Sequence, residues 1–211
     1  LKTFINSKKY KLTEFNNLTE CETSKILENS YRAINIAFID EWTKFAPKLE
    51  IDLLKIINAI KLRPTHSNLM KPGIGVGGYC LTKDPNFMNY SAKSLFKTKC
   101  QFPIINSSIK INKDMPKTSF EYLKLKTELI GKKILVCGLT YKEDTNDIRN
   151  SPTLDLIKLL WKKSSSISVY DPWVEKINLH SKKIKLVNIP DFKHDIIIFT
   201  VAHKIFKKID F

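Results

Sequence analysis

The sequence predicts a protein of mixed α+β and α/β class: an all-helical domain over residues 1–118, followed by a Rossmann-like domain with a parallel sheet over residues 119–211. Up to about residue 125, apolar side chains recur at steps of three and four, which is the spacing of amphipathic helices. From Gly131 onward, short apolar runs alternate with a helical pattern, which is typical of βαβ units. The second domain looks truncated, because we expect about three strands where such sheets commonly have about five or six.

The first helix is expected over residues 22–46, ETSKILENSYRAINIAFIDEWTKFA, and has the strongest helical pattern of the chain. Its large apolar side chains form one stripe, which predicts a long buried helix: Leu27, Tyr31, Ile34, Phe38, Trp42 and Phe45. Lys25, Asn29 and Arg32 fall on the opposite face, at the spacing where helical side chains are neighbours. That row is either a solvated surface or one wall of a polar pocket.

The remaining elements follow from shorter patterns. Three further helices are expected, over residues 51–62, 85–96 and 104–125. In the last of them, Pro116 either breaks the helix or opens its second half. In the second domain we expect strands over residues 133–137, 167–170 and 195–201, and a helix from Ser151 and Pro152 to about Lys163.

The composition is that of a globular protein with reduced cysteines. Of the 211 residues, 43% are hydrophobic, which is enough for a real core. The longest apolar run, residues 196–202, is far shorter than the roughly 18 residues of a membrane span, and residues 1–20 are too polar for a secretory signal. We therefore expect a cytoplasmic protein with no membrane partner. The four cysteines form no CxxC pair, so neither disulfides nor a metal site is expected.

The formal charge of +15 raises the question of nucleic-acid binding. The lysines come as scattered pairs, without a basic helix, a finger spacing or an aromatic-interleaved RNA motif. The charge is therefore better explained by compositional bias, and nucleic-acid binding is the weakest of the hypotheses. An anionic small ligand is still compatible with this charge.

No dinucleotide fingerprint follows a strand in this sequence. The first expected strand leads into GLTYKEDTNDIRNSP, residues 138–152, which has a single glycine. The G-x-G-x-x-G pattern that lets a backbone approach a pyrophosphate is therefore missing. The sheet resembles a Rossmann half without its usual dinucleotide loop.

A different glycine-rich stretch, KPGIGVGGYCLTKD over residues 71–84, lies between two expected helices. Its glycines permit positive φ and close backbone approach, and Cys80 behind them can sit at a helix start, where exposed amides favour the nucleophilic thiolate. Lys83 could assist, and Asp84 would share a helical face with Cys80, where it could accept a proton or orient a water. The alternative is a structural turn followed by a buried cysteine and a surface Lys and Asp.

Four separated motifs carry a family resemblance. They are ETSKILENSYRAINIA (22–37), KPGIGVGGYCLTKDP (71–85), GLTYKEDTNDIRNSP (138–152) and VYDP (169–172). Together they resemble the UDP-glucose/GDP-mannose dehydrogenase family of nucleotide-sugar 6-dehydrogenases, which includes the UDP-N-acetylmannosamine and UDP-N-acetylglucosamine enzymes. The resemblance covers the family's central helical domain and most of its C-terminal domain, whereas its N-terminal NAD-binding Rossmann domain is absent.

The resemblance implies an NAD-dependent oxidation of the C6 alcohol of a UDP-sugar to a carboxylate, for polysaccharide precursor biosynthesis. It implies that Cys80 is the nucleophile, which forms a thiohemiacetal and then a thioester. Asp84 matches the aspartate that handles the water or the proton. Lys25 and Asn29 match the pair that holds the C6 oxygen and stabilises its developing negative charge.

The resemblance also implies contacts with the substrate and the cofactor. The residues matched to the substrate site are Arg32, Lys71, Gly73, Gly75, Gly77, Gly78 and Lys142. Arg149 matches an arginine that reaches NAD. Asn150 stands where the family more often has Glu, so any ion pair of that Glu is lost, and His203 is expected to be structural and not catalytic.

The family's central helix pairs with its own copy, so a homodimer through residues 22–46 is expected. NAD is expected to be bound mainly by the missing domain, and this chain alone is not expected to turn over NAD. Three interpretations follow: a fragment or split-gene product of a dehydrogenase, a chain that works with a separate NAD-binding polypeptide, or a catalytically silent remnant that keeps dimerisation and nucleotide-sugar binding. The sequence does not identify the sugar.

Overall fold

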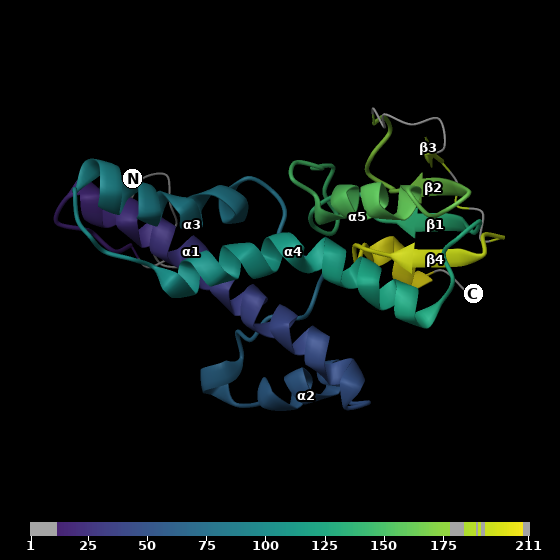
Figure 1. Ribbon diagram of the computed structural model, residues 1–211. Helices are drawn as coiled ribbons and strands as arrows, with labels where there is room; N and C mark the ends of the chain where they lie inside the picture. The colour runs from purple at the N-terminus through teal and green to yellow at the C-terminus, as the bar shows by residue number, and fades with distance from the viewer. Residues whose placement is uncertain (1–11, 178–183, 189, 191–192, 209–211) are drawn as a thin grey trace.

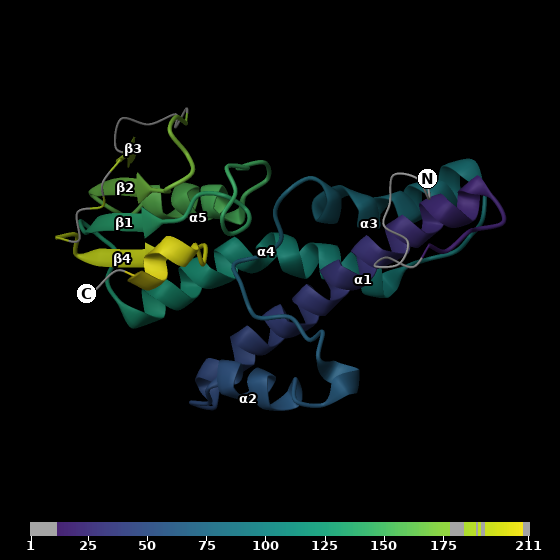
Figure 2. The same ribbon diagram turned by 180° about the vertical axis from the view of Figure 1, so that it is seen from behind.

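The fold has a helical part and a smaller α/β part, joined by one long helix (Figures 1 and 2). The computed structural model describes residues 12–177, 184–188, 190 and 193–208. Both views show α3 and the start of α1 at one end, the sheet with α5 at the other, α4 running between them, and α2 below α4 near the end of α1. Helix α4 packs against α1 in the helical part and against α5 in the α/β part. It therefore fixes the position of the two parts relative to one another.

The four helices of the helical part are longer or shorter than expected by a few residues. They are α1 (Leu18–Phe45), α2 (Leu53–Ile60), α3 (Cys80–Tyr90, continued by a π-helical turn over Ser91–Leu95) and α4 (Pro103–Lys126). Helix α1 starts early because the side chain of Asn17 accepts a hydrogen bond from the backbone N–H of Glu20. Pro116 neither breaks α4 nor opens a new helix, since α4 runs through it with Pro116 buried. The predicted domain boundary between residues 118 and 119 falls inside α4 and stays a prediction.

Most of the apolar stripe of α1 lies on the surface of this single chain, so the stripe is not buried within the chain as expected, whereas its burial between two copies stays a prediction. Leu27 is 64% exposed and Phe38 is 51% exposed. Apart from Ile39, the buried face of α1 carries small and polar side chains instead: Asn29, Ser30, Ala33, Ala37 and Asp40. Small side chains allow α3 and α4 to approach the α1 backbone closely, which large apolar residues would prevent. The large side chains are left on the opposite side of the helix.

The α/β part contains a parallel sheet in the order β3-β2-β1-β4. Its strands are β1 (Lys133–Cys137), β2 (Ser166–Tyr170), β3 (Ile184–Leu186) and β4 (Ile196–Phe199), and helix α5 (Pro152–Trp161) connects β1 to β2. The expected count of about three strands is therefore too low among the described residues alone. The strand that was missed, β3, has only three residues with a lysine in the middle, which is too short for a periodic pattern.

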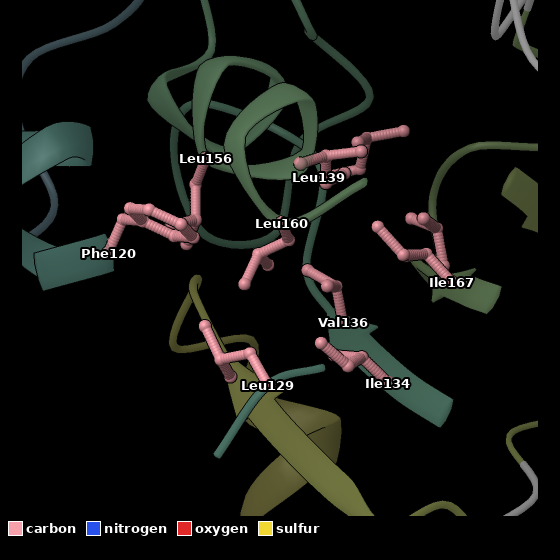
Figure 3. Close-up of a cluster of buried hydrophobic side chains, with 10 residues drawn as sticks. Phe120, Leu129, Ile134, Val136, Leu139, Leu156, Leu160 and Ile167 are labelled. Atoms are coloured by element: carbon pink, nitrogen blue, oxygen red, sulfur yellow. The ribbon is translucent and has the colours of Figure 1, made fainter. Parts of the chain in front are cut away.

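The core of the α/β part lies on both faces of β1, the central strand. Ile134 and Val136 point to the face covered by α5 and the end of α4 (Figure 3). Leu135 and Cys137 point to the other face, where Phe206 of the 3-10 helix Lys204–Lys208 packs on them. Burial raises the pKa of the Cys137 thiol to about 12, so this cysteine is a packing residue without reactivity at neutral pH.

The described helices do not include a candidate for a membrane span. None of them combines the length and the apolar character that crossing a bilayer requires.

Candidate active site and lysine groove

Cys80 is the first residue of α3 and is exposed. The glycine-rich stretch leads directly into the start of α3. Tyr79 at the N-cap makes no side-chain hydrogen bond to the first turn. The first backbone N–H groups of a helix have no intrahelical partner, so they present partial positive charge at its start. Such a position suits a negatively charged sulfur. The alternative interpretation, a buried cysteine behind a structural turn, does not agree with this exposure.

Asp84 lies one turn after Cys80 on α3 and contacts α1. The side-chain amide of Asn29 donates to Asp84 Oδ2 at 2.6 Å, and both residues are buried. The other oxygen of Asp84, Oδ1, lies 3.3 Å from the Nζ atom of Lys83. The structure thus brings together two residues predicted from separate motifs, and it fixes the Asp84 carboxylate from two sides.

Lys25 does not join this contact. Its ammonium pairs with Glu28 at 2.9 Å on the exposed face of α1, and this hydrogen bond lowers the pKa of the Glu28 carboxyl. The convergence of Lys25 and Asn29 on one point, which their spacing predicts, is therefore absent here. The physical reason is that Glu28 is a carboxylate within one turn of Lys25, whereas Asn29 faces α3. Arg32 is also exposed on α1 and does not line the groove described below.

Two cations flank the ring of Tyr79, next to Cys80. Lys83 Nζ lies 4.8 Å from the centroid of that ring, and the guanidinium of Arg149 lies 5.9 Å from it. Arg149 is held by Asp147 at 2.7 Å, and this hydrogen bond lowers the pKa of the Asp147 carboxyl. Arg149 therefore brings a positive charge, paired with Asp147, from the α/β part to the residue that precedes Cys80.

The glycine-rich stretch is joined to the loop that follows β1. The N–H of Gly78 donates to the carbonyl of Arg149 at 2.9 Å, and the side-chain amide of Asn150 donates to the Gly78 carbonyl at 3.0 Å. A Cβ atom on Gly77 would lie 2.5 Å from Cβ of Tyr141, so only glycine allows this approach. Asn150 thus makes a new hydrogen bond in place of the ion pair expected for Glu, and its φ of 50° is one that Asn tolerates.

The other two glycines of the stretch, Gly73 and Gly75, differ in how closely neighbouring atoms pack on them. Gly75 has a φ of 113°, and a Cβ atom there would lie 2.5 Å from the carbonyl oxygen of Asn112 in α4. Gly73 has open space around it, and its N–H donates to Asp40 Oδ1 at 3.2 Å. The amides of Gly73 and Gly78 are therefore used by protein groups. Gly75, Gly77 and Gly78 allow close packing of the chain.

A groove of about 660 Å³ lies between this stretch and the α/β part. Its walls come from residues 69–75, residues 140–143 and residues 200–202. Five lysines line it: Lys61, Lys71, Lys142, Lys204 and Lys207. Glu143 is the one acidic residue on its wall, so the described groove is strongly positive. A cavity of this size and charge fits an anionic small molecule.

Sequence reasoning found Lys71 and Lys142 in this groove and missed the other three lysines. Lys61 follows α2, whereas Lys204 and Lys207 lie in the last 3-10 helix, so no local motif links them. Lys204 pairs with Asp144 at 3.0 Å. The other four lysines form no ion pair with any residue that the structure describes, which leaves their charges available to a ligand.

Asp171 and His203 hold the backbone of the groove wall that carries Lys142. Asp171 Oδ2 accepts hydrogen bonds from the backbone N–H groups of Leu139 at 2.6 Å and Thr140 at 3.1 Å, and it lies 3.1 Å from His203 Nε2. His203 Nδ1 accepts from the backbone N–H of Asp144 at 3.0 Å, so the proton of a neutral ring is on Nε2. His203 is completely buried, in agreement with the structural role expected of it.

Comparison with known proteins gives matches along most of the chain. The central domain of the UDP-glucose/GDP-mannose dehydrogenase family matches residues 19–114, and the UDP binding domain of the same family matches residues 135–211. The UDP-N-acetyl-D-mannosamine dehydrogenase of Campylobacter jejuni is 34% identical over 197 residues, which are 90% of this chain and 47% of that protein. The UDP-N-acetyl-D-glucosamine 6-dehydrogenase of Salmonella typhi is 29% identical over 89% of this chain and 44% of its own length.

A solved structure agrees with these matches. The UDP-D-ManNAc dehydrogenase of Pyrococcus horikoshii superimposes with a TM-score of 0.72 at 30% identity, over 92% of this chain and 44% of that protein. The chain therefore spans somewhat less than half the length of these relatives. Because the two family domains together match well over half of its residues, the chain belongs to the UDP-glucose/GDP-mannose dehydrogenase family.

Proposed function

We propose that this chain supplies the nucleotide-sugar site and the catalytic cysteine of an NAD-dependent nucleotide-sugar 6-dehydrogenase. The observation that carries the proposal is the hydrogen bond between Asn29 and Asp84, one turn from Cys80 at an uncapped helix start. A buried amide and a buried carboxylate beside an exposed thiol are the groups that oxidation of an aldehyde through a thioester requires. The lysine groove on the same chain is suited to the phosphates of the nucleotide.

In this proposal Cys80 is the nucleophile. Its thiolate adds to the carbonyl carbon of the C6 aldehyde, and the carbonyl oxygen becomes the alkoxide of a thiohemiacetal. Once the C6 carbon has been oxidised, the same sulfur holds it as a thioester. Water then adds to the thioester carbon, and loss of the thiolate leaves a carboxylate. Cys80 therefore returns to its starting state.

Asn29 and Asp84 act on the oxygen atoms around this carbon. The amide of Asn29 can donate to the C6 oxygen as negative charge develops there. Asp84 lies at hydrogen-bonding distance from that amide and takes the proton from the attacking water. Lys25 can reach the C6 oxygen only if its ion pair with Glu28 breaks. Breaking this pair costs little free energy because both side chains are exposed.

Bound NAD would supply the hydride acceptor for each oxidation. One residue of this chain fits a contact with it: the guanidinium of Arg149, which is exposed, fixed by Asp147 and near the ring of Tyr79, the residue before Cys80. A planar cation of this kind pairs well with an anionic phosphate. No other NAD contact is assigned to the described residues, so the cofactor is expected to be held mainly by a domain or chain that carries a dinucleotide fingerprint.

The lysine groove is the proposed site of the UDP moiety. Lys71 and Lys142 both line it, from separate segments of the chain, and neither has an ion-pair partner among the described residues. The Campylobacter and Salmonella relatives are named for UDP-N-acetylated sugars, so UDP-N-acetylmannosamine and UDP-N-acetylglucosamine are the first substrates to test.

Calorimetric titration with UDP tests this assignment. We expect Lys142→Ala to weaken binding by about tenfold, since a charge-assisted contact contributes roughly 1.5 kcal/mol or more. Lys124→Ala, on the exposed surface of α4, is the matched control and should bind as the parent does. Absence of binding by the parent chain would refute the proposal.

A second candidate is a catalytically silent dimer that binds nucleotide sugars. The exposed stripe of α1 favours an assembly through that helix. An assay of NAD reduction separates the two: a chain that turns over only when a separate NAD-binding polypeptide is added is catalytic, and one that never does is the silent binder.

A further inference from the structure

One wall of the lysine groove, residues 69–75, has no helical or strand structure of its own. From Met70 to Gly77, no backbone N–H donates to a backbone carbonyl of a described residue. The conformation of this wall therefore has to come from side chains of neighbouring elements.

Helix α1 provides these side chains. Asn35 Oδ1 accepts from the N–H of Met70 at 3.2 Å, while its Nδ2 donates to the carbonyl of Asn68 at 3.3 Å. One amide side chain thus pairs with a backbone N–H at Met70 and a backbone carbonyl at Asn68, on the two sides of Leu69, as a neighbouring strand would. Further along α1, Asp40 Oδ1 accepts from the N–H of Gly73 at 3.2 Å. Lys71 lies between the two attachment points.

Placing a carboxyl group at Asp40 to accept this hydrogen bond carries a high desolvation free energy. It is completely buried, and its Oδ2 atom has no hydrogen-bond partner among the described residues. A neutral acceptor would hold the N–H of Gly73 at a lower desolvation cost. Burial raises the pKa of this carboxyl to about 7, so above that pH it is a charged acceptor, which holds a backbone N–H roughly twice as strongly as a neutral one.

We propose that Asn35 and Asp40 are positioning residues for the nucleotide-sugar site. They fix the segment on both sides of Lys71, which lines the groove together with Lys142. Neither residue lines the groove, and neither is required to touch the ligand. This inference rests on the proposed function, because it concerns the affinity of the groove for UDP.

The test compares Asn35→Ala, Asp40→Ala and Asp40→Asn with the parent chain, and uses Glu41→Ala as the control. Glu41 is the exposed neighbour of Asp40 on α1. Titration with UDP measures affinity, and amide hydrogen exchange followed by NMR measures the protection of Met70 and Gly73. Asp40→Asn keeps an oxygen acceptor for Gly73 and is the conservative rescue.

We expect Asp40→Ala and Asn35→Ala each to weaken UDP binding by about tenfold, the equivalent of one lost hydrogen bond. Asp40→Asn should recover most of that loss. Exchange of the Gly73 amide should be faster in Asp40→Ala, and that of Met70 in Asn35→Ala.

The outcomes separate this inference from the proposed function. If the parent binds UDP and both alanine variants bind it equally well, the positioning role is wrong and the proposed function stands. If the parent does not bind UDP while the alanine variants lose amide protection, the groove assignment is wrong and the attachment of the segment stands. Unchanged exchange at Met70 and Gly73 would overturn the inference directly.

Discussion

The amide of Asn29 donates to the carboxylate of Asp84 at 2.6 Å, across a separation of 55 residues in the sequence. This contact joins α1 to α3 and holds the carboxylate one turn away from the exposed sulfur of Cys80. A buried carboxylate is costly without partners, and Asp84 has partners on both oxygens. The pair therefore stabilises the fold and also defines the geometry of the proposed active site.

Asn29→Ala removes this hydrogen bond and leaves a buried oxygen of Asp84 without its donor. We expect the free energy of unfolding to fall by about 1–3 kcal/mol, because the carboxylate loses a partner that water cannot replace. Thermal and denaturant unfolding measure the change. Lys25→Ala is the control, since Lys25 makes only an exposed ion pair, and a loss of similar size there would contradict this account.

Much of the fold and part of the site could be predicted from the sequence, because the signals are local. The strand over residues 133–137 and the position of Cys80 at a helix start follow from neighbouring residues. Which face of α1 is buried could not be predicted, since the choice depends on where α3 and α4 pack. Lys61 and Lys207 were missed for the same reason: only the folded chain brings them to the groove.

Gly77→Ala should destabilise the contact between the glycine-rich stretch and the loop after β1. The added Cβ would lie 2.5 Å from Cβ of Tyr141 and 2.8 Å from the carbonyl oxygen of Asn150. Overpacking of this kind costs about 1–3 kcal/mol. Gly73→Ala is the matched control in the same stretch, because nothing lies within 4 Å of its added Cβ. Equal melting temperatures for the two variants would show that the packing at Gly77 is unimportant.

The stability of the chain should depend on pH through Asp40. Burial raises the pKa of this carboxyl from 3.8 to about 7 in the folded state. Between these two values the folded chain holds a proton that the unfolded chain has released, so this group makes stability fall as pH rises. The decrease ends above pH 7, where both states are ionised.

Asp40→Asn removes that titration. At pH 8 the variant should be more stable than the parent, by up to roughly 4 kcal/mol, and its advantage should shrink toward pH 5. Denaturant unfolding at several pH values measures this difference. A difference that does not change with pH would contradict the buried charge.

The exposed stripe of α1 predicts self-association. Phe38 and Trp42 are both more than 40% exposed, and large apolar patches on a surface mark interaction sites. We expect the parent chain to sediment as a dimer and Phe38→Glu as a monomer, because a carboxylate would be buried without a partner. Leu125→Glu, which is 84% exposed in the parent and lies on α4, is the matched control and should stay dimeric. A monomeric parent would contradict the prediction.

The central claim is the proposal that the sugar of a nucleotide bound in the lysine groove reaches Cys80, because Gly78, two residues before it, packs on the groove residue Tyr141. Three cysteines are exposed, Cys21, Cys80 and Cys100, so two of them are internal controls. Alkylation with iodoacetamide, followed by peptide mass spectrometry with and without UDP-N-acetylmannosamine or UDP-N-acetylglucosamine, measures all three in one sample. We predict that Cys80 reacts fastest and that at least one UDP-sugar slows its alkylation alone. Equal rates at the three cysteines, with no protection of Cys80, would contradict the account.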